Sequence, residues 1–63
     1  MNMKVIYGKH DAKGRVSVAR VEVMNLSHAE ALRMSKFENI AAITAQETMK
    51  ARMVYVNGLL TQV

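Results

Sequence analysis

The sequence of 63 residues contains no cysteine, no proline and no tryptophan. Without cysteine the chain is not a disulfide-stabilised mini-protein, and a zinc module with thiolate ligands is excluded. No apolar run approaches the roughly 18 residues that cross a bilayer, and the first residues lack the apolar segment of a signal peptide. We therefore expect a cytoplasmic protein that binds no membrane.

Groups that carry out catalysis are also scarce. The only imidazoles are His10 and His28, too few for a metal site that needs three or four ligands when cysteine is absent. No serine lies in a Gly-x-Ser-x-Gly nucleophile motif. Gly8 and Gly14 flank a segment between two predicted strands, so no helix N-terminus is available for a phosphate loop. We expect no enzyme activity, no metal and no cofactor.

The chain does contain enough apolar residues for one small domain, with 51% hydrophobic and 22% charged residues. This balance is too apolar for a disordered segment. A domain of about 60 residues buries only about 60% of its unfolded surface and is marginally stable. Burial at an interface is the most available reinforcement. We predict a single domain over residues 1–63 that forms a homo-oligomer rather than a monomer.

A β-hairpin is predicted at each end of the chain. Residues 3–7 and 15–24 are rich in β-branched residues, and the polar segment 8–14 between them begins and ends with glycine, which is typical of a loop. Residues 51–63 form the second predicted hairpin. Its centre is Asn57-Gly58, the pair that best tolerates the positive φ angles of a type I′ turn.

The valines of the second predicted strand do not keep one phase. They are Val16, Val18, Val21 and Val23. In a regular strand the first two point to one side and the last two to the other. Either a β-bulge near Ala19-Arg20 resets the phase, or both faces of the strand are covered.

The clearest local signal is the start of a helix at Ser27. Glu30 lies three residues later, so that each side chain can accept from a free backbone N–H, as in a capping box. The end of the helix has two interpretations. The segment that follows has no proline or glycine and much alanine, which favours one helix to about Met49. The alternative is a helix that ends near Glu38, with residues 40–46 extended, because the apolar residues form no single helical stripe.

With the longer helix, the order of elements is β-β-α-β-β. This order predicts an α+β fold, in which one helix packs across one face of an antiparallel sheet. Phe37, which falls within the helix, is expected in the core.

Nine basic residues against five acidic ones give a formal net charge of +4. An excess of positive charge steers a protein toward an acidic protein surface or a phosphate backbone. One cluster lies near the first hairpin loop, and a second lies on the helix at a spacing of three residues. The candidate partner-binding residues are Lys9, Lys13, Arg15, Arg33 and Lys36.

The order of elements resembles that of a known class of inhibitors. A hairpin leads through VEVMNLSHAEA at residues 21–31 into a helix, and Val56-Asn57-Gly58-Leu59 form a turn. This arrangement is similar to small phage-encoded inhibitors, in particular an anti-CRISPR family of the β-β-α-β-β type that acts on type I surveillance complexes. The resemblance implies a non-enzymatic mechanism, in which a compact basic domain sits on the DNA-binding surface of the complex.

The sequence thus predicts a non-enzymatic binding protein, encoded by a phage or another mobile element. It would inhibit or modulate a protein or nucleoprotein complex of the host by occluding a surface. The alternative is a small basic nucleic-acid-binding transcriptional regulator that acts as a homodimer. A third interpretation is a subunit of a ring or filament.

Overall fold

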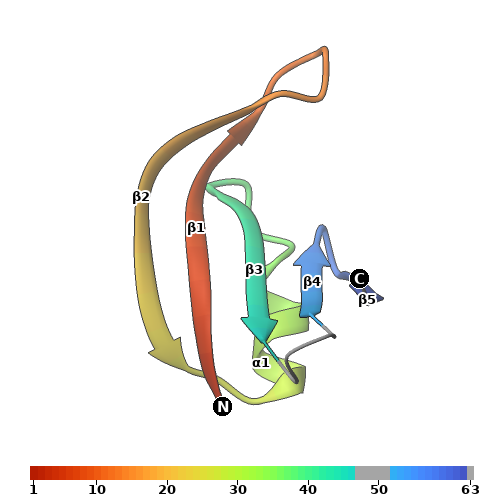
Figure 1. The fold of residues 1–63 in the computed structure, drawn as a ribbon. Helices are drawn as coiled ribbons and strands as arrows, with labels where there is room; N and C mark the ends of the chain where they lie inside the picture. The colour runs from red at the N-terminus through yellow and green to blue at the C-terminus, as the bar shows by residue number, and fades with distance from the viewer. Residues whose placement is uncertain (47–51, 63) are drawn as a thin grey trace.

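A computed structural model describes residues 1–46 and 52–62, which form an α+β fold. The elements are β1 (Asn2–His10), β2 (Val16–Asn25), α1 (His28–Met34), β3 (Ile40–Gln46), β4 (Arg52–Val56) and β5 (Leu59–Gln62). The strands form one antiparallel sheet in the order β2-β1-β3-β4-β5, with the short α1 on one side of it (Figure 1). No helix in the described part of the chain is long and apolar enough to span a membrane.

The predicted helix to about Met49 is wrong, and the order β-β-α-β-β is replaced by β-β-α-β-β-β. The helix ends at Met34, and residues 40–46 are the extended segment of the alternative interpretation. Burial in β3 alternates with period two, because Ala41, Ile43 and Ala45 are buried and the residues between them are half-buried. This alternation explains why the apolar residues did not form one helical stripe. Residues 47–51 and 63 lie outside the described residues.

The start of α1 is confirmed as predicted. Ser27 is the N-cap and forms a capping box with Glu30. The Glu30 N–H donates to Ser27 Oγ (3.2 Å), and the Ser27 N–H donates to Glu30 Oε1 (3.1 Å). Leu26 and Ala31, on either side of this cap, are both buried in the core.

The second hairpin is confirmed over its described residues. Asn57 (φ 51°) and Gly58 (φ 78°) both have positive φ, as a type I′ turn requires. The turn is joined to the end of α1 by Ser35, whose side chain is almost fully buried. The Gly58 N–H donates to Ser35 Oγ (2.8 Å), and Ser35 Oγ donates to the Leu32 carbonyl (2.7 Å).

The core lies between α1 and the sheet. Its largest fully buried side chains are Tyr55, Met3, Ile43 and Val5. The Tyr55 hydroxyl lies 2.8 Å from Nδ1 of His28, and the two rings meet edge to face at 5.4 Å between centroids. A polar contact therefore fixes the first turn of α1 on β4, while Ser35 fixes its last turn.

A β-bulge interrupts the pairing of β1 with β2. Tyr7 pairs with Arg20 and Gly8 with Val18, which leaves Ala19 as the extra residue. Of the two alternatives that the valine pattern allowed, the structure shows the β-bulge near Ala19-Arg20. A Cβ atom built at Gly8 would collide with the backbone carbonyl oxygen of Ser17, so the bulge requires glycine for close approach.

We predict that Gly8→Ala lowers the free energy of unfolding by about 1–3 kcal/mol, because the added Cβ forces β1 and β2 apart. Urea unfolding followed by circular dichroism measures the change. Ser17→Ala is the matched control, since it keeps the backbone carbonyl and should alter the free energy by less than about 0.5 kcal/mol. An unfolding midpoint for Gly8→Ala equal to that of the wild type would contradict the close approach.

The capping box makes the stability of α1 depend on pH. The Ser27 N–H, and then the Ser27 hydroxyl, hold the pKa of Glu30 below its ordinary value of 4.5. A carboxylate with a lowered pKa stabilises the fold above that ordinary value, and this contribution is lost as the pH falls through the lowered pKa. We expect Glu30→Gln, which does not titrate, to show a smaller loss of stability on acidification in urea unfolding. Identical acid profiles for the two proteins would count against the contact.

Candidate functional site

The first hairpin projects from the sheet. Register pairing of β1 with β3 ends at Tyr7 and Ile40. Beyond this level the Gly8 N–H still donates to the Asn39 carbonyl (2.9 Å), and Lys9 and His10 pair with β2 alone. We call residues 8–18 the hairpin arm. Figure 1 shows it extending past the ends of β3 and β4. The predicted loop at residues 8–14 is shifted, because β1 continues to His10 and the loop comprises residues 11–15.

The loop of the hairpin arm is organised by Asp11. Its Oδ1 accepts hydrogen bonds from the backbone N–H groups of Lys13 and Arg15, each at 2.9 Å. The Asp11 N–H donates to the Arg15 carbonyl (2.9 Å), and Gly14 closes the turn with a φ of 79°. At the base of the arm, Nε2 of His10 lies 2.9 Å from the Ala41 carbonyl oxygen. Both ends of the arm are therefore fixed by hydrogen bonds.

The structure brings some of the predicted binding residues together and separates others. Lys9, Lys13 and Arg15 are exposed side chains of the hairpin arm. Lys36 follows α1 and, like Lys9, lines a groove where that helix ends. Arg33, in the last turn of α1, lines neither this groove nor the groove beside the arm.

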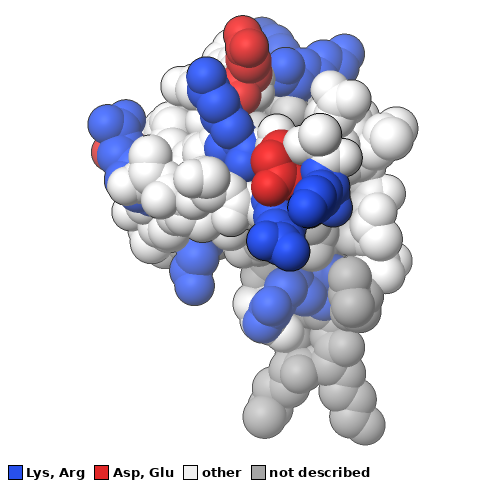
Figure 2. Space-filling view, turned by 90° about the horizontal axis from the view of Figure 1, so that it is seen from above, with Lys and Arg blue, Asp and Glu red and all other residues white. Residues whose placement is uncertain are grey.

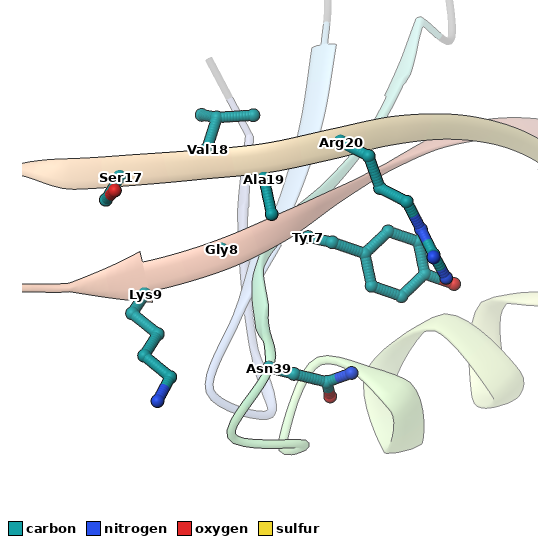
Figure 3. A pocket seen from close by; sticks show the side chains of 8 residues that line it. All are labelled: Tyr7, Gly8, Lys9, Ser17, Val18, Ala19, Arg20 and Asn39. Carbon is teal, nitrogen blue, oxygen red and sulfur yellow. The ribbon is translucent and has the colours of Figure 1, made fainter.

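A first groove, the bulge groove, lies beside the arm and has a volume of about 470 Å³. The residues that line it are Tyr7, Gly8, Lys9, Ser17, Val18, Ala19, Arg20 and Asn39 (Figure 3). One wall is a cation–π pair, since the Arg20 guanidinium carbon lies 4.3 Å from the centre of the Tyr7 ring. The side chains of Lys9 and Asn39 project to the same side of the strands as this pair (Figure 3).

A second groove, the end groove, lies where α1 ends and has a volume of about 430 Å³. Lys9 lines both grooves, so it stands between them. Phe37 lines the end groove and is 53% exposed, which contradicts its expected place in the core. Its ring falls in the connection between α1 and β3 rather than within a helix, and so it does not reach the core.

The hairpin arm and the two grooves present Lys and Arg side chains, the Asn39 amide and apolar walls. Groups of these kinds bind a partner non-covalently. Among residues 1–46 and 52–62, no group of three or more His, Asp or Glu side chains could hold a metal ion. Figure 2 looks down on this end of the molecule, where Lys and Arg side chains lie over several parts of the surface with acidic side chains between them. Positive charge predominates on this end of the molecule, but acidic side chains interrupt it.

The sequence did not indicate the Tyr7–Arg20 wall. The two residues become neighbours because they pair across β1 and β2 at the bulge. The hydrophobic pattern locates a bulge only to within a few residues, so the pair could not be placed from the pattern alone.

No protein-family model, curated protein or solved structure matches this chain. Its function is therefore inferred from the geometry of the hairpin arm and the two grooves.

We expect Asp11→Ala to loosen the loop, because the N–H groups of Lys13 and Arg15 lose their shared acceptor. Amide hydrogen exchange at these two residues should accelerate by about tenfold, the factor that corresponds to 1.4 kcal/mol. Asp11→Asn keeps an Oδ1 acceptor and should retain most of the protection. Unchanged exchange in Asp11→Ala would show that the carboxylate does not organise the loop.

Proposed function

We propose that this chain is a non-enzymatic binding protein that inhibits or modulates a macromolecular partner by covering part of its surface. The observation that carries the proposal is the hairpin arm, which places Lys9, Lys13 and Arg15 on one projecting element. Positive charge on such an element steers it toward an acidic surface and speeds the encounter. Because Asp11 holds the loop in one conformation, little conformational entropy is lost on contact.

A protein surface is favoured over bare nucleic acid as the partner. Asp11 within the arm and Glu38 at the end groove interrupt the positive charge, whereas a phosphate backbone is uniformly negative. The exposed ring of Phe37 adds an apolar anchor of the kind that is enriched at protein interfaces. In a host nucleoprotein complex, the arm would accordingly contact the protein component.

The resemblance to anti-CRISPR inhibitors agrees with this mechanism, and a phage or mobile-element origin rests on that resemblance alone. The additional strand makes the order of elements differ from the β-β-α-β-β pattern. For this reason the charge and rigidity of the arm, rather than the resemblance, support the proposal.

One observation favours the alternative, a nucleic-acid-binding regulator that acts as a homodimer. The Tyr7–Arg20 pair forms a flat wall beside the basic arm, and flat aromatic or guanidinium surfaces stack on bases. Arg20 is also paired with Glu22 at 3.4 Å, which lowers the net positive charge of that wall.

A pull-down from a lysate of the host cell, with and without nuclease, tests the proposal. Arg15→Glu reverses a charge on the arm, and Arg33→Glu makes the same change on α1 as the matched control. We expect Arg15→Glu to retain about tenfold less partner, a loss of 1.4 kcal/mol, while Arg33→Glu and nuclease treatment leave retention unchanged.

Two outcomes would contradict the proposal. If nuclease abolishes capture, and binding to a labelled duplex oligonucleotide weakens steeply with salt, the nucleic-acid regulator is the better description. If both charge reversals reduce capture equally, the arm is not the contact surface.

A further inference from the structure

The sheet has two edges of different kinds. The strand order places β5 at one edge and β2 at the other (Figure 1). β5 has only four residues, whereas β2 has ten, and a short edge strand is one means by which proteins avoid pairing with other chains. Lysine and proline serve the same purpose and are both absent from β2. The edge formed by β2 is therefore the one that can accept a further strand.

The bulge limits the usable length of this edge. Ala19 interrupts the ladder, and a strand added there would have to follow the bend. From Arg20 to Asn25, every residue of β2 pairs with β1 in one unbroken register. We call residues 20–25 the open edge.

A hydrogen bond at the end of β2 shows which backbone groups the open edge presents. The Leu26 N–H donates to the Met1 carbonyl (2.9 Å), and these two residues continue the register of β1 with β2. In an antiparallel ladder, pairs that exchange hydrogen bonds alternate with pairs that do not. The even-numbered residues of the open edge therefore turn their N–H and C=O groups toward β1. Those of Val21 and Val23 point outward, where none of the described strands pairs with them.

The other side of β1 gives the same phase. The Gly8 N–H donates to the Asn39 carbonyl (2.9 Å), so Gly8 turns its backbone groups toward β3. Ile6, two residues earlier in the strand, does the same, and Ile6 pairs with Val21. Because facing residues of this kind turn their backbone groups away from each other, Val21 presents a donor and an acceptor at the outer side of the sheet.

The residues next to Val21 carry opposite charges. Arg20 and Glu22 flank it on one face of β2 and form an ion pair at 3.4 Å, with side chains that are 63% and 44% exposed. A second copy of β2, running antiparallel and centred on Val21, sets Arg20 directly opposite Glu22 of that copy, and Glu22 opposite its Arg20. Opposite charges at facing positions stabilise a strand pair, and like charges destabilise it. The order Arg-Val-Glu is thus complementary to itself.

We propose that the open edges of two copies pair antiparallel about a two-fold axis at Val21, which joins two five-stranded sheets into one. Each Val21 N–H donates to the Val21 carbonyl of the other copy, and main-chain hydrogen bonds of this kind are the basis of strand addition. An axis at Arg20 or at Glu22 sets like charges opposite each other. The pairing lies outside the hairpin arm and does not rest on the proposed function.

Sedimentation equilibrium tests the pairing, since the dimer has twice the chain mass of 7.1 kDa. A contact confined to one strand is smaller than a standard interface, so we expect a dissociation constant between about 10 µM and 1 mM. Val21→Pro removes the outward N–H, and edge strands tolerate proline where that group faces solvent. We expect it to raise the dissociation constant by at least about tenfold.

Val21→Thr is the matched control, because it keeps the N–H and a β-branched side chain. It should change the dissociation constant by less than about threefold. Circular dichroism and urea unfolding verify that both variants remain folded. A wild-type chain that is monomeric up to about 1 mM overturns the proposal. So does a dimer that the two variants weaken equally, because the outward N–H then takes no part in it.

Charge reversal tests the register independently of the backbone. Arg20→Glu makes both positions acidic and Glu22→Arg makes both basic, so each variant alone should dimerise at least about tenfold more weakly than the wild type. An equimolar mixture sets opposite charges at both facing positions and should restore association. The double variant Arg20→Glu/Glu22→Arg, which exchanges the two charges within one chain, should dimerise like the wild type. A mixture that associates no better than either variant alone rules out the axis at Val21.

Amide hydrogen exchange locates the contact in the wild-type chain. The Val21 N–H should exchange more slowly as the concentration rises from about 10 µM to 1 mM, because it is hydrogen-bonded only in the dimer. The Glu22 N–H points toward β1 in both states and is the internal control, whose rate should change less. Slowing that is confined to other parts of the chain would place the interface elsewhere and contradict the proposal.

Discussion

The close approach of β1 and β2 at Gly8 is the contact on which both faces of the first hairpin depend. Because Gly8 has no Cβ, the Ser17 carbonyl can come near enough for the ladder to close around Ala19. On the α1 side, the resulting bulge sets Arg20 against Tyr7 and forms the wall of the bulge groove. On the opposite side, it aligns the valines of β2. One missing side chain thus positions the groove and the exposed valines of β2 together.

Contacts at the two ends of α1, rather than its number of helical turns, stabilise this short helix. A helix of seven residues is too short to be stable in isolation. Tyr55 contacts His28 in the first turn, and Ser35 binds the turn between β4 and β5 from just beyond the last turn. Both anchors lie on the C-terminal hairpin, so α1, β4 and β5 form one unit linked by partly buried polar contacts. The hairpin arm, which lies outside this unit, carries the exposed charges.

The parts of the fold that depend on residues close together in the sequence could be predicted from it. The capping box at Ser27 and the turn at Asn57-Gly58 need only a few adjacent residues, and the structure confirms both. The cluster of basic residues on the arm could be anticipated for the same reason, since a hairpin keeps sequence neighbours close in space.

The parts that depend on distant pairing could not be predicted. Residues 40–46 contain three alanines, whose helix propensity favoured a longer helix. As β3, however, this segment lies between β1 and β4, where Ala41 and Ala45 are buried, and this tertiary pairing overrides propensity. The sequence allowed a bulge or a strand covered on both faces as alternatives for β2. The choice depends on the contact between Gly8 and Ser17, which only the register of the two strands determines.

The position of β1 has a consequence for synthesis of the protein. β1 lies between β2 and β3 in the sheet, and Lys4 pairs with Thr44 far along the chain. As the polypeptide emerges from the ribosome, β1 and β2 can pair well before β3 and α1 exist. At that stage Met3 and Val5 on one side and the valines on the other are all in contact with water, and an isolated two-stranded hairpin is only marginally stable. The nascent hairpin is thus the stage of biosynthesis most exposed to aggregation, and rapid completion of the chain or chaperone binding would protect it.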